Sequence, residues 1–149
     1  MKILMPVDGS EYTRHMLDYL AAQSAHSQRA EGGWLGKPHE ITCVTVVPPL
    51  PPRVRGIMNE AEAQAYYRTE AEGALQPVVE FAARRGWEPA IIHRVGRPGK
   101  VIADMAVEES FDLILMGSHG HSALGALLLG SVTSQVLAQC KVPVLVPRP

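Results

Sequence analysis

This 149-residue chain has neither an excess of basic or acidic residues nor a long apolar stretch. Its 14 basic residues nearly balance 15 acidic ones, and the net charge of −1 excludes the basic surface typical of nucleic-acid-binding proteins. No apolar stretch approaches the roughly 20 residues that span a bilayer. The apolar run before Asp8 is also shorter than a signal-peptide core, which has about 7–15 residues. The composition therefore predicts a cytoplasmic protein that binds neither nucleic acid nor membranes.

Cysteine is scarce as well, with only Cys43 and Cys140 in the chain. Neither thiol has a second cysteine or a histidine at the spacing of a metal site. In cytosolic proteins such free thiols usually act as small buried hydrophobic residues. The sequence therefore predicts no metal or redox site built on cysteine.

Short apolar runs alternate with helical patterns along the whole chain. Runs rich in apolar and β-branched residues predict five strands, at 2–7, 41–47, 90–95, 112–116 and 143–146. Apolar residues at helical spacing predict helices from about residue 11, over 59–85, around 101–107 and over 132–140. This alternation is typical of a single α/β domain over 1–149, with a doubly wound parallel sheet covered by helices on both faces.

Several residues predict where these elements begin and end. Ser10 is suited to cap the first helix, and Gly86 is suited to end the long one. The proline run at 48–52 predicts a stiff, extended segment. The residues at 96–99, which include Pro98 and two glycines, predict a turn after the third strand.

The most informative motif follows the fourth predicted strand and precedes a helix. It reads Gly117-x2-Gly120-x9-Gly130-Ser131. Glycine lets backbone N–H groups approach an anion closely, and a helix N-terminus adds unpaired N–H groups with a partial charge of about +0.5. The motif therefore predicts a phosphate-binding loop. It is neither a Walker A sequence, since no Gly-Lys-Ser/Thr is present, nor a dinucleotide fingerprint.

This motif, the opening Pro6-Val7-Asp8-Gly9-Ser10 and the ending Val142-Pro143-Val144-Leu145-Val146 together resemble the universal stress protein family, and within it the ATP-binding branch. The resemblance covers the whole chain. It implies a Rossmann-like, five-stranded sheet of order 3-2-1-4-5. It also implies ATP, with or without Mg²⁺, in the crevice at the carboxyl ends of the strands.

The same resemblance implies which residues contact an adenine nucleotide. Pro6 and Val7 would lie beside the adenine, and Val46 would present backbone groups to its edge. The carboxylate of Asp8 would accept from the ribose hydroxyls, a contact that suits its two oxygens; a divalent metal contact and a capping role remain alternatives for it. The remaining contacts would lie under the ribose and around the phosphates, at Met116, Gly117, His119, Gly120, Gly130, Ser131, Val132 and Thr133.

Residues 142–146, which contain the last predicted strand, carry apolar side chains on both faces. An edge strand of this kind exposes an unpaired row of N–H and C=O groups. Pairing with a second copy about a two-fold axis would remove that edge. A homodimer through this strand is therefore predicted, in agreement with the resemblance.

The residues predict nucleotide binding without a catalytic set. Hydrolysis needs a positioned water, a base and charge stabilisation, whereas 121–127 contain neither lysine nor arginine. Phosphate binding would depend on backbone N–H groups, hydroxyls and the histidines at 119 and 121. The prediction is an ATP-binding regulatory or stress-response protein rather than a dedicated enzyme. The alternatives are a nucleotide hydrolase or adenylyl-transfer domain of the same architecture, a nucleotide-free interaction module, and a protein for AMP or a cyclic nucleotide.

Overall fold

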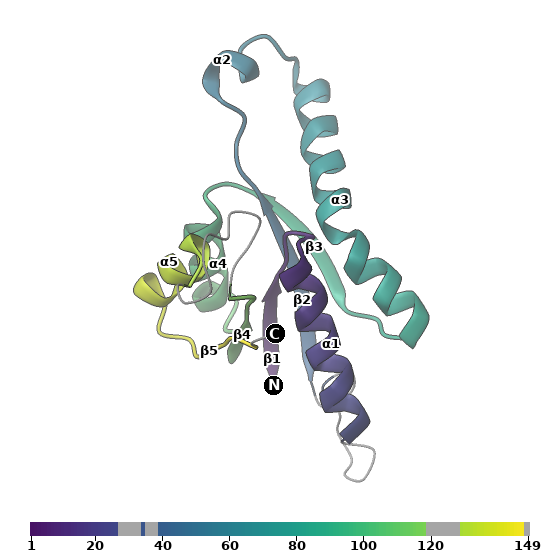
Figure 1. Ribbon diagram of the computed structural model, residues 1–149. Coiled ribbons are helices and arrows are strands. Elements are labelled where there is room, and N and C mark those ends of the chain that lie inside the picture. The colour runs from purple at the N-terminus through teal and green to yellow at the C-terminus, as the bar shows by residue number, and fades with distance from the viewer. Residues whose placement is uncertain (27–33, 35–38, 119–128, 148–149) are drawn as a thin grey trace.

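The computed structural model describes residues 1–26, 34, 39–118 and 129–147. Along these residues strands and helices alternate (Figure 1). The strands are β1 (Lys2–Pro6), β2 (Glu40–Val47), β3 (Ala90–Val95), β4 (Leu113–Leu115) and β5 (Val144–Leu145). The helices are α1 (Glu11–His26), α2 (Pro52–Arg55), α3 (Glu60–Arg85), α4 (Pro98–Glu108) and α5 (Ser131–Gln139).

The five strands form one parallel sheet in the order β3-β2-β1-β4-β5. The predicted order 3-2-1-4-5 is therefore confirmed. Met5 of β1 pairs with Cys43 of β2, and Leu4 pairs with Ile114 of β4 on the other side. The strand order reverses between β1 and β4, and in open α/β sheets ligands bind in the crevice at such a reversal.

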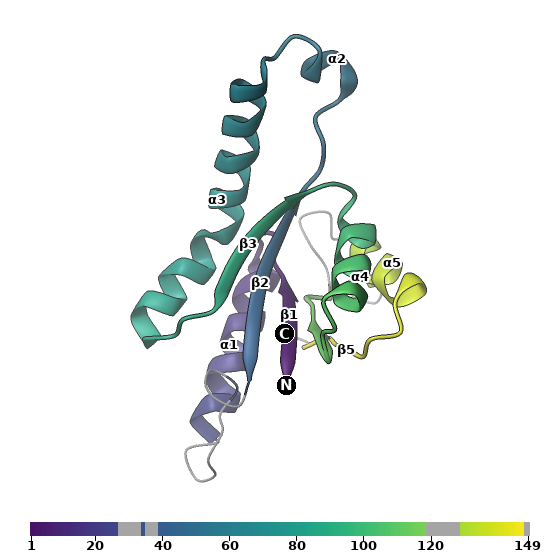
Figure 2. The same ribbon diagram turned by 180° about the vertical axis from the view of Figure 1, so that it is seen from behind.

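Helices cover both faces of the sheet, with α1 and α3 on one face and α4 and α5 on the other (Figures 1 and 2). Alternate residues of β1 belong to two separate cores. Ile3 and Met5 are fully buried on the side of α1 and α3, whereas Leu4 is fully buried on the side of α4 and α5. Burial on both faces explains why β1 is a nearly continuous apolar run.

The termini of α3 follow its sequence. Asn59 and Glu62 form a capping box at the N-terminus, and Gly86 ends the helix in the left-handed conformation, as predicted, with a φ of 60°. The first half of α3 projects with α2 beyond the sheet (Figure 1). There the hydroxyl of Tyr67 accepts a hydrogen bond from the backbone N–H of Leu50 at 3.0 Å, which joins the two sides of the projection.

Three elements differ from the predictions. The short helix α2 begins at Pro52, the last residue of the proline run predicted to be extended, and α4 begins at Pro98, inside the predicted turn. Proline suits the first position of a helix because its missing N–H would have no partner there. The last strand has two residues where four were predicted. None of the helices in the described ranges combines the length and the apolar content that crossing a bilayer requires.

Candidate functional site

One cavity of about 300 Å³ lies at the carboxyl ends of β1, β2 and β4, where the strand order reverses. Ten of the predicted contact residues line it, although they come from four separate parts of the chain. These are Pro6, Val7, Asp8, Val46, Met116, Gly117, Gly130, Ser131, Val132 and Thr133. His119 and Gly120, the other two predicted contacts, lie outside the described residues.

Seven further residues line the cavity and were not predicted. Three of them, Tyr12, Thr13 and Met16, lie on one face of α1, at a spacing that a helical projection from residue 11 could have indicated. The other four are Val44, Pro48, Pro98 and Ile102. Most of these side chains are apolar, so this part of the cavity wall suits an apolar or weakly polar group.

The N-terminus of α5 opens onto this cavity. Gly130 is its N-cap residue, and within the described residues no side chain caps the helix and no acidic residue lies in its first turn. The first N–H groups of a helix attract anions when nothing else pairs with them. Ser131 is exposed at this position and Val132 is half-buried, so this part of the cavity favours a negatively charged group.

Two hydrogen bonds connect the residues that follow β4 with the start of α5. The N–H of Gly130 donates to the carbonyl oxygen of Ser118 at 2.7 Å. The buried hydroxyl of Thr133 donates to the carbonyl oxygen of Gly117 at 3.0 Å. The Thr133 proton is therefore used inside the protein, which leaves the backbone N–H of Thr133 as its donor for the predicted phosphate contact.

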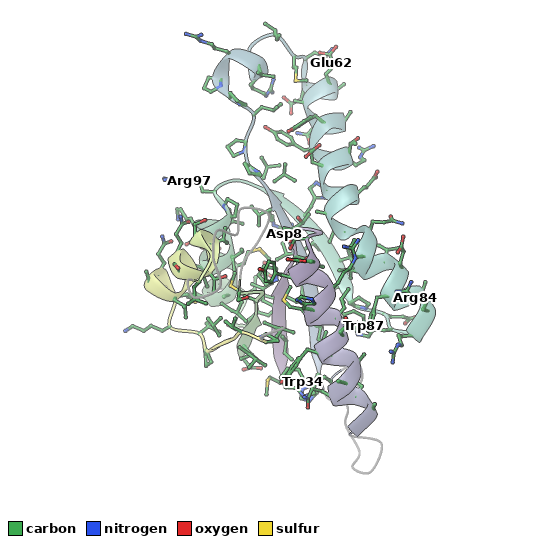
Figure 3. The ribbon with its side chains drawn as sticks, viewed as in Figure 1. Asp8, Trp34, Glu62, Arg84, Trp87 and Arg97 are labelled. Carbon is green, nitrogen blue, oxygen red and sulfur yellow. The ribbon has the colours of Figure 1, made fainter. Side chains whose placement is uncertain are left out.

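Asp8 lies where β1 leads into α1, whereas Trp34 lies near the opposite end of α1 (Figure 3). The Oδ1 atom of Asp8 accepts hydrogen bonds from the Ser10 N–H at 3.0 Å and from the Thr13 hydroxyl at 3.2 Å. The predicted cap by the Ser10 side chain is wrong. The Ser10 hydroxyl is buried without a hydrogen-bond partner in the described part of the chain, and the Thr13 N–H donates to the Ser10 carbonyl oxygen at 3.1 Å. The Asp8 carboxylate, a stronger acceptor than a hydroxyl, organises this loop instead.

The described wall of the cavity carries one carboxylate, that of Asp8, and no lysine or arginine. Over the described ranges, no three histidine, cysteine, aspartate or glutamate side chains are grouped closely enough to hold a metal ion. Among the described residues, Asp8 therefore forms no three-ligand metal site with histidine, cysteine or other carboxylate side chains. The arrangement can bind a molecule that has an apolar ring system, a polar middle and an anionic end.

Comparison with known proteins agrees with this geometry. Residues 1–148 match the model of the universal stress protein family. The universal stress protein YxiE of Bacillus subtilis is 32% identical over 152 residues, which cover 99% of this chain and 98% of YxiE. A universal stress protein of Thermus aquaticus is 30% identical over 148 residues, which cover 98% of this chain and 97% of that protein. The solved structure of MJ0577 from Methanocaldococcus jannaschii superposes with a TM-score of 0.73 at 27% identity, over 99% of this chain and 95% of its own. The fold, the cavity and these relatives together show that the chain belongs to the universal stress protein family.

Proposed function

We propose that this protein is a cytoplasmic, ATP-binding regulator of the stress response that acts as a homodimer. The observation that carries the proposal is the convergence of ten predicted contact residues on one cavity at the reversal of the strand order. They come from the end of β1, from β2, from the end of β4 and from the start of α5. A site assembled from such separate segments is hard to explain by the packing of the core alone.

Solved proteins of the same fold support an adenine nucleotide as the ligand. A universal stress protein is known in complex with cAMP, one from Archaeoglobus fulgidus in complex with dAMP, and a family member from Arabidopsis thaliana with AMP bound. Their TM-scores with this chain are 0.65, 0.64 and 0.62, at identities of 19%, 20% and 13%. At these identities the likeness establishes the shared fold, and the nucleotide remains our proposal for this chain.

We propose that the three parts of ATP lie in sequence along the cavity. Its volume of about 300 Å³ lies at the lower end of the range of about 300–1,000 Å³ for small-molecule sites. Pro6, Val7 and Val46 would contact the adenine, and Asp8 would accept from the ribose hydroxyls. The phosphates would lie at the N-terminus of α5 and extend towards Gly117, the first glycine of the motif. Mg²⁺ would bind mainly to phosphate oxygens, as it does in many nucleotide sites.

We propose a binding role rather than rapid turnover. Phosphoryl transfer to water needs a base or a residue that orients the water, together with positive charge near the γ-phosphate. Among the described residues that line the cavity, Asp8 carries the carboxylate, and its Oδ1 already accepts hydrogen bonds from Ser10 and Thr13. ATP occupancy itself would therefore be the signal.

The proposed dimer uses the edge formed by β5. In the described sheet β5 pairs with β4 on one side and is the last strand of the order. Val142, Val144 and Val146 are each half-buried in the isolated chain. A second copy paired along this edge would satisfy its backbone groups and cover these side chains.

Titration calorimetry with ATP, with and without Mg²⁺, tests the nucleotide proposal after co-purified nucleotide has been removed. In a Gly130→Val variant the branched side chain would obstruct the approach of phosphate to α5. Gly73→Val is the matched control, since a Cβ at Gly73 would meet no heavy atom within 4 Å outside its helix in the described structure. We expect saturable binding by the wild type and the control and none by Gly130→Val, with all three folded. No binding by the wild type at millimolar ATP would refute the proposal.

A further inference from the structure

Thr13 holds the loop between β1 and α1. It lies in the first turn of α1, is fully buried and lines the cavity. Its hydroxyl oxygen is 3.2 Å from Asp8 Oδ1, 3.2 Å from the backbone nitrogen of Asp8 and 3.2 Å from that of Gly9. Three polar atoms of the loop therefore converge on one hydroxyl.

The direction of each of these bonds depends on the chemistry of the partners. An ionised carboxylate only accepts hydrogen bonds, and a backbone N–H only donates them. The Thr13 hydroxyl therefore donates to Asp8 Oδ1 and accepts from the N–H groups of Asp8 and Gly9. A hydroxyl has one proton and two lone pairs, and all three are used by the loop. Thr13 thus acts on the loop rather than on a ligand, although it lines the cavity.

These bonds fix the orientation of the Asp8 carboxylate. Oδ1 also accepts from the Ser10 N–H at 3.0 Å, so two donors from different residues hold the same oxygen. Asp8 lines both the cavity of about 300 Å³ described above and a second cavity of about 400 Å³ beside α3. Rotation of the Asp8 side chain would break both bonds to Oδ1, so the two bonds together hold the carboxylate in one orientation.

The backbone that carries Asp8 is held by neighbouring elements as well. The Val7 N–H donates to the carbonyl oxygen of Val44 at 2.8 Å, which extends the pairing of β1 with β2 beyond the strand. On the other side of Asp8, Gly9 lies against the backbone of α3, where a Cβ would come within 3.0 Å of the Ala74 Cα. Thr13 therefore completes a loop that is already restrained at both ends.

We propose that Thr13 is a positioning residue that presents the Asp8 carboxylate to the sugar hydroxyls of a ribonucleotide. The inference rests on the proposed function, since it requires a nucleotide in the cavity. An acceptor that is already oriented loses less conformational entropy on binding than a mobile one. Thr13 therefore sets how strongly the site prefers a ribose diol to a sugar that lacks both hydroxyls.

The test is titration calorimetry of the wild type, Thr13→Val and Thr13→Ser with ATP and with 2′,3′-dideoxy-ATP. Valine fills the same volume as threonine without the hydroxyl, and serine keeps the hydroxyl. We expect Thr13→Val to weaken ATP binding about tenfold, as typical for the loss of a hydrogen bond to a charged group. Dideoxy-ATP binding should weaken by less than about twofold, because its sugar makes no contact that Asp8 could lose. Thr13→Ser should bind ATP like the wild type.

A matched control removes the neighbouring hydroxyl of the same loop. Ser10→Ala deletes a buried group that has no hydrogen-bond partner in the described residues, so it should leave the affinity for both nucleotides unchanged. Thr13→Ala replaces Thr13→Val if the valine variant does not fold, as judged by circular dichroism.

Two results would overturn the inference. Equal weakening of ATP and dideoxy-ATP binding by Thr13→Val would assign Thr13 to the fold of the loop alone. Unchanged ATP binding by the same variant would show that Asp8 needs no positioning. If the wild type binds neither nucleotide, the proposed function fails first, and that outcome is seen before any variant is compared.

Discussion

A single methyl group at Gly9 tests how closely the loop after β1 approaches α3. The φ of Gly9 is +78°, in the left-handed region. A Cβ there would lie 3.0 Å from the Cα of Ala74 and 3.2 Å from its carbonyl oxygen. Both neighbours are helix backbone atoms and cannot rotate away. Gly9→Ala should therefore combine a left-handed penalty of about 1–2 kcal/mol with an overpacking penalty of about 1–3 kcal/mol.

Gly86→Ala separates these two penalties. Gly86 also has a positive φ, of +60°, but a Cβ there would meet no heavy atom within 4 Å in the described structure. We expect Gly86→Ala to lower the free energy of unfolding by about 1–2 kcal/mol and Gly9→Ala by about 2–5 kcal/mol. Urea unfolding followed by circular dichroism measures both. Equal losses in the two variants would refute the reasoning, because the loop would then have no close contact with α3.

Three further predictions concern other parts of the molecule. Burial raises the pKa of the Cys43 thiol to about 12 from 9.0, so its contribution to stability is complete below pH 9 and is lost as the pH rises towards 12; urea unfolding between pH 8 and pH 11 should show a steeper decline for the wild type than for Cys43→Ala. Asn59→Ala removes one side of the capping box with Glu62 and should lower the free energy of unfolding by about 1 kcal/mol, with faster hydrogen exchange at the start of α3. Val146→Glu should place like charges across the proposed dimer edge and reduce the mass in light scattering from twice 16.2 kDa to 16.2 kDa; a wild type at 16.2 kDa would contradict the dimer.

Composition alone predicts the strands of the sheet, but it does not predict their order. Strands buried on both faces must be apolar along their length, so the segments that became β1, β2 and β4 were recognisable from composition. That pattern predicts a parallel sheet but does not order its strands. The order came from the family resemblance, which rests on the glycine motif and the two ends of the chain, and the structure confirms it.

The two helix starts that the sequence predicted wrongly both lie at a proline. Pro52 and Pro98 each begin a helix, α2 and α4, but in the sequence both residues suggested an extended or turning segment. A proline that interrupts a helix and a proline that starts one differ in the residues after them along the chain and in the elements packed against them. At α4 the next residue, Gly99, is buried, and a Cβ there would lie 2.6 Å from the Cβ of Gln135 on α5. That contact between helices is invisible to a local pattern.

At the site itself, the hydrogen bonds of Ser10 and Thr13 also could not be predicted from the local sequence. A local capping rule chooses the Ser10 hydroxyl as the partner of the Thr13 N–H. In the structure that N–H pairs with the Ser10 carbonyl oxygen, and the loop polar groups turn to the Thr13 hydroxyl and the Asp8 carboxylate. The loop conformation depends on the positive φ of Gly9 and on its close approach to the backbone of α3 at Ala74, both of which are possible because glycine has no Cβ. The orientation of Asp8 is therefore decided partly by a helix far along the chain. Gly9→Ala, which disturbs the loop from the side of α3, should accordingly also reduce the preference for ATP over dideoxy-ATP that Thr13 is proposed to set.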